Sequence, residues 1–112
     1  MMIEELRTYC LAKNNVSEGF PFDEKTLVFK VHGKIFALFA LEEVPLRINL
    51  KCEPEKAIEL REAFEQVVPG YHCNKKHWNT IVIEQLPVKQ ILEWIDHSYQ
   101  LVWDKLPKKI KG

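Results

Sequence analysis

The sequence has no excess of either charge, because 16 lysines and arginines balance 16 aspartates and glutamates among its 112 residues. A neutral chain has no net field that would attract it to nucleic acid or to an anionic membrane, so DNA binding would require its cations to gather on one face. No apolar run approaches the roughly 20 residues that a membrane-spanning helix needs. We therefore expect a protein that does not enter the membrane.

Cysteine is also scarce, with Cys10, Cys52 and Cys73 as its only occurrences and no Cys-x-x-Cys spacing. Three cysteines cannot all pair within one chain, and reduced thiols are typical of cytoplasmic proteins. Glu4 and Glu5 stand where a signal peptide would have its basic start. We expect a cytoplasmic monomer with one domain over residues 1–112.

The apolar residues follow helical and strand periods in turn. They predict a helix over 2–13, two strands over 26–31 and 34–40 joined by a tight His32-Gly33 turn, and a strand over 45–51. A second helix should begin at Pro54 with Phe64 and Val67 on its buried stripe, and a long helix should follow Pro87, with a strand over 80–83 between the two helices. This order predicts a two-layer α+β domain with helices packed on one face of an antiparallel sheet. We also expect Phe20 and Phe22 to enter the core.

Candidate chemistry is concentrated between Pro69 and Thr80, and from Gly70 to Ile83 the chain has no acidic residue. A metal site could use His72, Cys73 and His77, but their spacing matches no compact zinc pattern. A nucleophilic Cys73 would need its pKa lowered by its basic neighbours, and no catalytic motif surrounds it. We therefore expect no metal, no cofactor, no catalytic residue and no enzymatic activity.

Two interpretations of this segment stay open. Lysines contact phosphates, asparagines bond to base edges or sugars, and Trp78 offers a stacking surface, so the segment could contact nucleic acid. Alternatively it is a hydrogen-bonded corner in which Asn74 caps a turn and Trp78 fills the core. The outward residues of the strand over 45–51 add two cations, which could equally be a solvated sheet face.

Several short motifs carry a family resemblance. They are Tyr9-Cys10-Leu11, Phe20-Pro21-Phe22-Asp23, Asn49-Leu50-Lys51-Cys52, Asn74-Lys75-Lys76-His77-Trp78-Asn79 and Ile95-Asp96-His97-Ser98-Tyr99. With them the chain resembles the MmcQ/YjbR family of small bacterial proteins, which have the CyaY-like (frataxin-like) fold. The resemblance implies a double-stranded DNA partner, approached by two β-hairpin "wings". One wing would be the hairpin at His32-Gly33, and the other would combine the segment from His72 to Thr80 with the strand that holds Arg47.

The resemblance also raises iron binding, which frataxin-like proteins perform on an acidic ridge along the first helix. Here the first helix has only Glu4 and Glu5, followed by Arg7 and Lys13, so we do not expect an iron site. A protein- or small-ligand-interaction module on the same open sheet face is the alternative to DNA binding. The candidate nucleic-acid-binding residues are Arg47, Asn49, Lys51, His72, Asn74, Lys75, Lys76, His77, Trp78 and Asn79.

Overall fold

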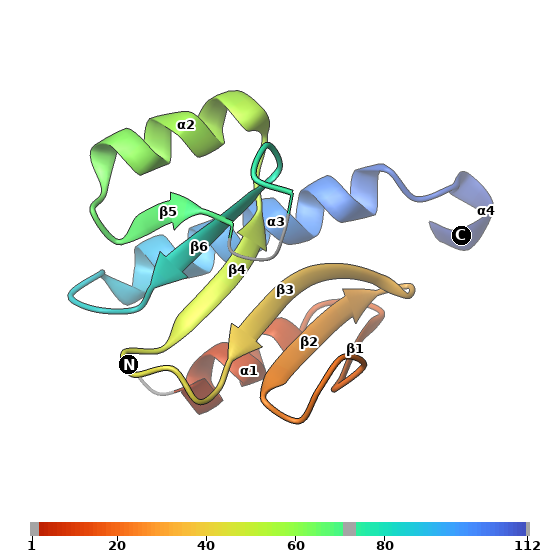
Figure 1. Cartoon of the computed structure of the whole chain (residues 1–112). Helices are drawn as coiled ribbons and strands as arrows, with labels where there is room; N and C mark the ends of the chain where they lie inside the picture. Colours follow the sequence, from red (N-terminus) through yellow and green to blue (C-terminus); the bar gives the residue numbers. More distant parts are fainter. Residues whose placement is uncertain (1–2, 71–73, 112) are drawn as a thin grey trace.

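The fold is built on one antiparallel sheet of six strands, seen in a computed structural model that describes residues 3–70 and 74–111 (Figure 1). The strands follow the order β1-β2-β3-β4-β6-β5, and every neighbouring pair is antiparallel. Their bounds are β1 Val16–Gly19, β2 Thr26–Val31, β3 Lys34–Ala40, β4 Arg47–Lys51, β5 Val67–Pro69 and β6 Trp78–Val82.

The helices cover one face of this sheet. They are α1 Ile3–Leu11, α2 Pro54–Ala63 and α3 Val88–Asp104, while the short α4 Lys108–Lys111 lies beyond the end of α3, away from the sheet (Figure 1). In Figure 1, α1 and α3 lie behind the sheet, and α2 lies by β5 and β6. α2 shares this face, because its Leu60 and the following Phe64 pack on the same hydrophobic core as Ile91 and Ile95 of α3. The expected two-layer α+β architecture is therefore confirmed.

The core follows from the alternation of residues along the strands. Leu27, Phe29 and Val31 of β2 are buried toward the helices, and the Phe29 ring lies 4.9 Å from that of Phe39, measured between centroids. The tight turn after β2 is also confirmed, since His32 and Gly33 have φ values of 47° and 79°. Two positive φ angles in succession are typical of the two-residue hairpin turn that glycine permits.

A bulge in β3 separates β3 from β4 at one end of the sheet. The β2–β3 register shifts between Phe29 and Lys30, and the β3–β4 pairing stops after Ala37 and Leu50. Ser98 of α3, which is fully buried, bridges the separated strands: its hydroxyl donates to Phe36 O and accepts the Lys51 N–H at 2.8 Å. One side chain thus satisfies two backbone groups that the open ladder would leave unpaired.

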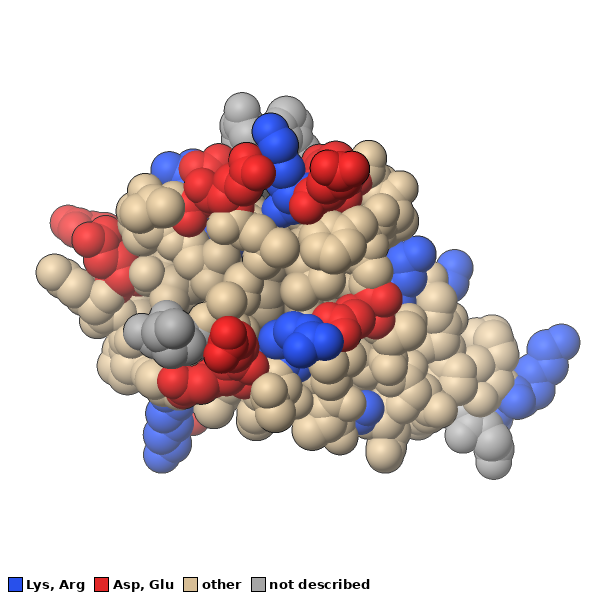
Figure 2. Space-filling model, turned by 90° about the horizontal axis from the view of Figure 1, so that it is seen from below, with Lys and Arg blue, Asp and Glu red and all other residues tan. Residues whose placement is uncertain are grey.

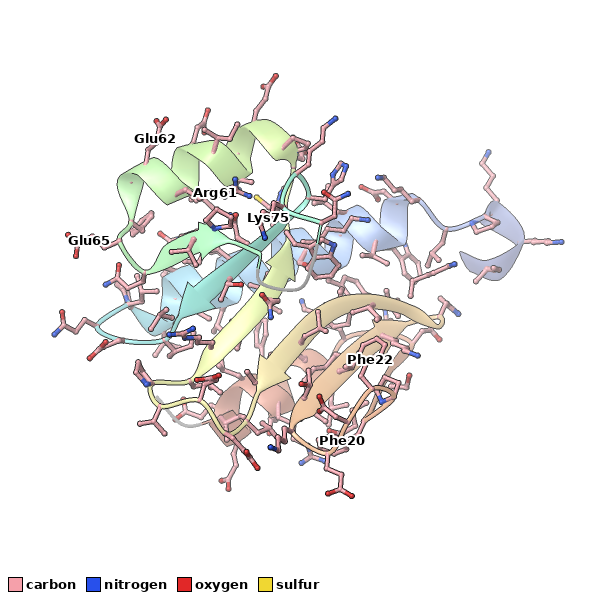
Figure 3. All side chains as sticks on the ribbon, viewed as in Figure 1. Phe20, Phe22, Arg61, Glu62, Glu65 and Lys75 are labelled. Atoms are coloured by element: carbon pink, nitrogen blue, oxygen red, sulfur yellow. The ribbon has the colours of Figure 1, made fainter. Side chains whose placement is uncertain are left out.

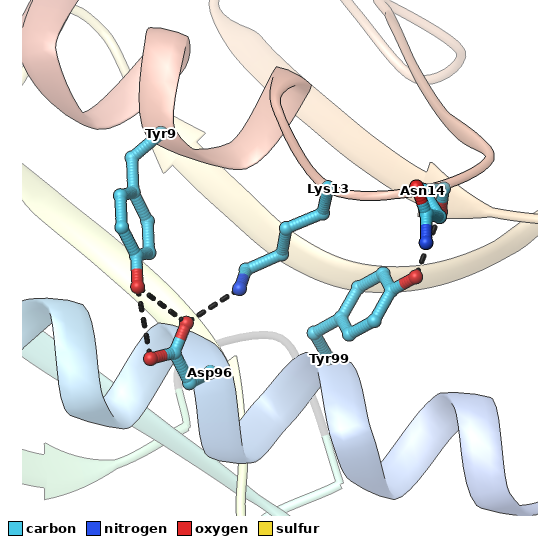
Figure 4. Close-up of polar contacts among 5 residues, drawn as sticks. All are labelled: Tyr9, Lys13, Asn14, Asp96 and Tyr99. Carbon is cyan, nitrogen blue, oxygen red and sulfur yellow. Dashed lines mark hydrogen bonds and ion pairs between the residues drawn. The ribbon is translucent and has the colours of Figure 1, made fainter.

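Polar contacts fix α1 to α3 (Figure 4). The Tyr9 hydroxyl donates to both oxygens of Asp96, at 2.7 and 2.9 Å, and Lys13 pairs with the same carboxylate. Tyr99 donates to the carbonyl of Asn14 at 2.7 Å. Tyr9 and Asp96 both belong to the motifs that carry the family resemblance, and their contacts here hold two helices together.

Two expectations about the chain path are wrong. The second helix ends at Ala63 and does not include Phe64 or Val67, because Val67 pairs with Ile81 and starts the edge strand β5. Phe20 and Phe22 are 50% and 65% exposed instead of buried. The Asp23 carboxylate accepts the N–H groups of the two residues that lead into β2, which turns the chain and keeps this loop outside the core.

Candidate nucleic-acid interface

The sheet face opposite the helices, here called the open face, carries several cations from its strands. Strand register places Lys30 of β2 and Arg47 and Lys51 of β4 on it, beside Asn49 and Trp78. Applied to all six strands, the same alternation places no aspartate or glutamate on this face within the strands that the structure describes. Lys30 is absent from the sequence-based candidates, although the outward alternation that marks Arg47 and Lys51 also marks Lys30.

A tight turn over residues 74–77 leads into β6. The Asn74 side chain accepts the Lys76 N–H at 2.9 Å, and its carbonyl accepts the Trp78 N–H at 2.9 Å. This is an Asx-type turn, so the expectation that Asn74 caps a turn is confirmed. Lys76 and Lys75 are exposed on this turn, and the Lys75 ammonium also donates to Gly70 O at 3.2 Å.

Arg61 of α2 clamps this turn (Figure 3). Its Nη2 donates to the carbonyl of Lys75 and, at 3.3 Å, to that of Trp78, while its Nε donates to Asn79 Oδ1 at 2.7 Å. The Asn79 amide also reaches Ala57 O at 3.4 Å. The guanidinium fork therefore joins α2, the turn and β6 in one contact.

The turn lies at the Lys51 end of β4. Trp78 pairs with Lys51, and the Cys52 N–H donates to His77 O at 2.8 Å. Lys51, His77 and the two lysines of the turn therefore gather at one end of the open face. Arg47 lies four residues away along β4, which at the rise of a strand is roughly 13 Å.

Three of the candidate residues need separate comment. Trp78 is half-buried on the open face, so it does not fill the core. Asn79 points into the helix-covered side, is only 1% exposed and has both ends of its amide bonded, so it cannot reach a ligand on the open face. His72 lies outside the described residues, as do Tyr71 and Cys73, and with them part of the metal and nucleophile alternatives considered from the sequence.

The first expected wing is held against the body of the protein. The His32 ring lies 5.7 Å from the Trp103 ring of α3, measured between centroids, and the His32 N–H donates to Asn15 O at 3.2 Å. Part of the second wing lies outside the described residues. The pair of wings therefore stays a prediction, and the described residues show only that the hairpin at His32-Gly33 contacts α3.

The charges divide along the length of the molecule. Seen from below in Figure 2, both basic and acidic side chains occur on the left and in the centre of a largely uncharged surface, while the charged side chains at the right-hand end, toward α4, are basic. At the same end, burial and secondarily the Lys105 ammonium lower the pKa of Lys51 below its usual value. Like charges are thus held near one another at the α4 end.

Metal and thiol chemistry find no support in residues 3–70 and 74–111. No group of three or more histidines, cysteines and carboxylates is arranged there to hold a metal ion. Cys10 and Cys52 are buried thiols, and burial raises the pKa of Cys10 to about 12. Such a thiol is almost fully protonated near neutral pH and is a poor nucleophile. In these same ranges, no helix has the length and apolar character to cross a membrane.

Comparison with known proteins gives a consistent picture. A family model described as YjbR matches residues 11–101. The chain is 36% identical over 110 residues to the uncharacterized protein YjbR of Escherichia coli (strain K12), covering 97% of this chain and 93% of that protein. It is 39% identical over 92 residues to the uncharacterized protein YbdF of Escherichia coli O157:H7, covering 80% and 75%.

A solved structure agrees with the fold. The crystal structure of Deinococcus radiodurans protein DR2400, a DUF419 domain, superposes with a TM-score of 0.91 at 39% sequence identity. The match covers 96% of this chain and 83% of that chain. The described architecture is therefore shared with this Deinococcus radiodurans protein.

Proposed function

The chain belongs to the YjbR family, and from the charge on its open face we propose that it is a non-catalytic protein that binds double-stranded DNA weakly through the phosphate backbone. The observation that supports this most directly is the gathering of Lys30, Lys51, Lys75 and Lys76 at one end of a face without strand carboxylates. Lysines meet phosphates as point charges, which requires no fixed geometry.

The same geometry favours sequence-independent binding. Asn79, the side chain best suited to read a base, is bonded within the protein. Asn49 accepts the Thr80 hydroxyl on the open face and is only half-buried, so it remains the one side-chain amide that could approach the duplex from β4. Affinity at physiological salt should accordingly be in the non-specific range, with Kd on the order of 10⁻⁴ to 10⁻⁶ M.

Acidic side chains restrict the direction of approach. α2 carries Glu55, Glu59 and Glu62 on its exposed surface, and Glu65 follows it. Figure 3 shows Glu62 and Glu65 pointing outward at the α2 side of the molecule. These carboxylates repel a phosphate backbone, so the duplex must approach over the open face at its Lys51 end.

The test is a fluorescence anisotropy titration of a labelled duplex at several salt concentrations. If four lysines each neutralise one phosphate, log K should fall with log salt at a slope of about −4. The double variant Lys75→Gln/Lys76→Gln should reduce the slope by about 2. The matched control Lys25→Gln/Lys89→Gln, which also removes two exposed lysines but lies off this patch, should leave it unchanged. Absence of binding at low salt, or equal slopes for the two double variants, would refute the proposal.

A protein- or small-ligand-interaction module is the second candidate. It is favoured by a cavity of about 330 Å³ on the open face, where Phe20 and Pro21 face Val28 and Lys30. Glu18 and Lys30 also line this cavity, so its apolar contribution comes from Phe20, Pro21 and Val28. A ligand that buries these three side chains should bind with little dependence on salt and should bind more weakly in Phe20→Ser. A salt slope near zero would therefore favour this candidate over DNA.

A further inference from the structure

A second cavity opens where the bulge separates β3 from β4. It has a volume of about 300 Å³ and lies against the C-terminal end of α3. Ser98 bonds to both strands from the core side, in place of a direct backbone hydrogen bond between Phe36 and Lys51. The two strands therefore stay apart, and the cavity between them is open to the surface. We call it the lysine cavity, and the lining residues that matter here are Lys34, Ile35, Lys51, Val102, Lys105 and Leu106.

Three of these residues are lysines from three different elements. Lys34 begins β3, Lys51 ends β4 and Lys105 caps α3, and no acidic side chain lines the cavity. Asp104 precedes Lys105 in the chain, but its carboxylate accepts a hydrogen bond from Gln100 at 2.7 Å and is not part of the lining. Of the three, Lys51 and Lys105 lie near each other, because burial and secondarily the Lys105 ammonium lower the pKa of Lys51.

The helix dipole alone does not explain this arrangement. The C-terminal end of α3 favours a cation within its last turn, which accounts for Lys105. Lys34 and Lys51 come from strands, where the α3 dipole does not account for them, yet they line the same cavity. An anion bound in the cavity would stabilise the three cations around it, because it offsets their mutual repulsion.

The apolar residues that line the cavity indicate what else the ligand contains besides an anionic group. Ile35, Val102 and Leu106 give the cavity an apolar floor. Its volume is near the lower limit for small-molecule sites and has room for roughly ten water-sized groups. A phosphate monoester carries up to two negative charges near neutral pH, whereas a carboxylate carries one. Three ammonium groups should therefore attract the phosphate monoester more strongly than the carboxylate.

We propose that the lysine cavity binds a small phosphate monoester that carries an apolar group. The phosphate lies among the three ammonium groups, and the apolar group rests on the floor of the cavity. This site shares Lys51 with the open-face patch but goes beyond the proposed DNA binding, because Lys34 and Lys105 belong to the cavity alone while Lys75 and Lys76 belong to the patch alone.

The experiment is an NMR titration of the ¹⁵N-labelled full chain with phenyl phosphate, followed through the backbone amides at constant ionic strength. Saturable shifts should appear at Lys34, Lys51 and Lys105, with Kd on the order of a millimolar. Inorganic phosphate should bind the same amides several-fold more weakly, because it leaves the apolar floor uncovered.

Two substitutions test the cations. Lys105→Gln and Lys34→Gln each remove one exposed ammonium and should weaken phenyl phosphate binding about tenfold. Lys89→Gln is the matched control, since it removes an exposed lysine from the other end of α3, about 24 Å away along the helix axis. Its affinity should equal that of the unaltered chain.

Several results would overturn the inference. These are shifts spread evenly over all exposed lysines, equal affinities for phenyl phosphate and inorganic phosphate, or an unchanged affinity in Lys105→Gln and Lys34→Gln. The duplex titration with the Lys75→Gln/Lys76→Gln variant tests DNA binding and not the lysine cavity. Failure of DNA binding leaves the phenyl phosphate result standing, and failure of phenyl phosphate binding leaves the salt slope standing.

Discussion

Replacing Arg61 with alanine should destabilise the protein more than any other single change on the surface of α2. The substitution removes the donor to Asn79 Oδ1 and the donors to the carbonyls of Lys75 and Trp78. The two carbonyls belong to residues that are exposed or half-buried, so water can replace much of what they lose. Asn79 is 1% exposed, and its oxygen would be left buried without a donor.

The expected cost follows from that difference. A buried polar atom without a partner costs about 1–3 kcal/mol, and the loss of charge-assisted bonds at the turn adds to it. We expect the free energy of unfolding to fall by about 3 kcal/mol and the midpoint of thermal unfolding to fall by roughly 10 °C. Arg61→Lys should recover only part of this, because an ammonium cannot reproduce the planar fork.

Urea unfolding followed by circular dichroism measures this directly. Glu62→Ala is the matched control, because Glu62 is the next residue of α2 and points to solvent (Figure 3). It should change the free energy of unfolding by less than about 0.5 kcal/mol. The reasoning is refuted if Arg61→Ala is as stable as Glu62→Ala, since the clamp would then contribute nothing beyond a surface residue.

Two further predictions concern the anchoring of α1 and the close approach of β5 to β6. The hydrogen bond to Asp96, followed by burial, raises the pKa of Tyr9 to about 12, so the folded chain keeps a proton that the unfolded chain releases near pH 10. This stabilisation is complete below pH 10 and is lost as the pH rises toward 12. The free energy of unfolding should therefore fall more steeply between pH 10 and 12 in the unaltered chain than in Tyr9→Phe. Equal slopes of unfolding free energy against pH in the two proteins would contradict the role given to the Tyr9–Asp96 hydrogen bond. Gly70→Ala should lower the free energy of unfolding by about 1–3 kcal/mol, because an added Cβ would lie 2.8 Å from both Cβ and the carbonyl oxygen of Trp78. Gly19→Ala, where an added Cβ meets nothing within 4 Å, is its control, and equal stability of the two variants would rule out the clash.

The local patterns of the chain were sufficient to identify most of its elements. β2 and β3 match the predicted ranges residue for residue, because a period of two and a glycine that accepts positive φ are properties of neighbouring residues. The long helix after Pro87 was likewise recognisable from its helical period. β1 and β5 were missed, since each is short and forms a strand only because a neighbouring strand offers it a hydrogen-bonding edge.

The candidate site was predictable only in part. Arg47 and Lys51 were found from their alternation, and Asn74 from its turn-forming chemistry, because both signals act over a few residues. Asn79 was misplaced because its role depends on Arg61, which lies 18 residues away in sequence and contacts it only after α2 packs beside β6.

The sequence by itself determined the strand and helix periods, the tight hairpin and the neutral overall charge. Only the tertiary structure decided which of those charges meet. Lys34, Lys51 and Lys105 are separated by 17 and 54 residues, and they line one cavity because a bulge, a buried serine and the end of α3 coincide there. Local preferences extend over a turn or two of chain, whereas the proximity of distant side chains is set by register and packing.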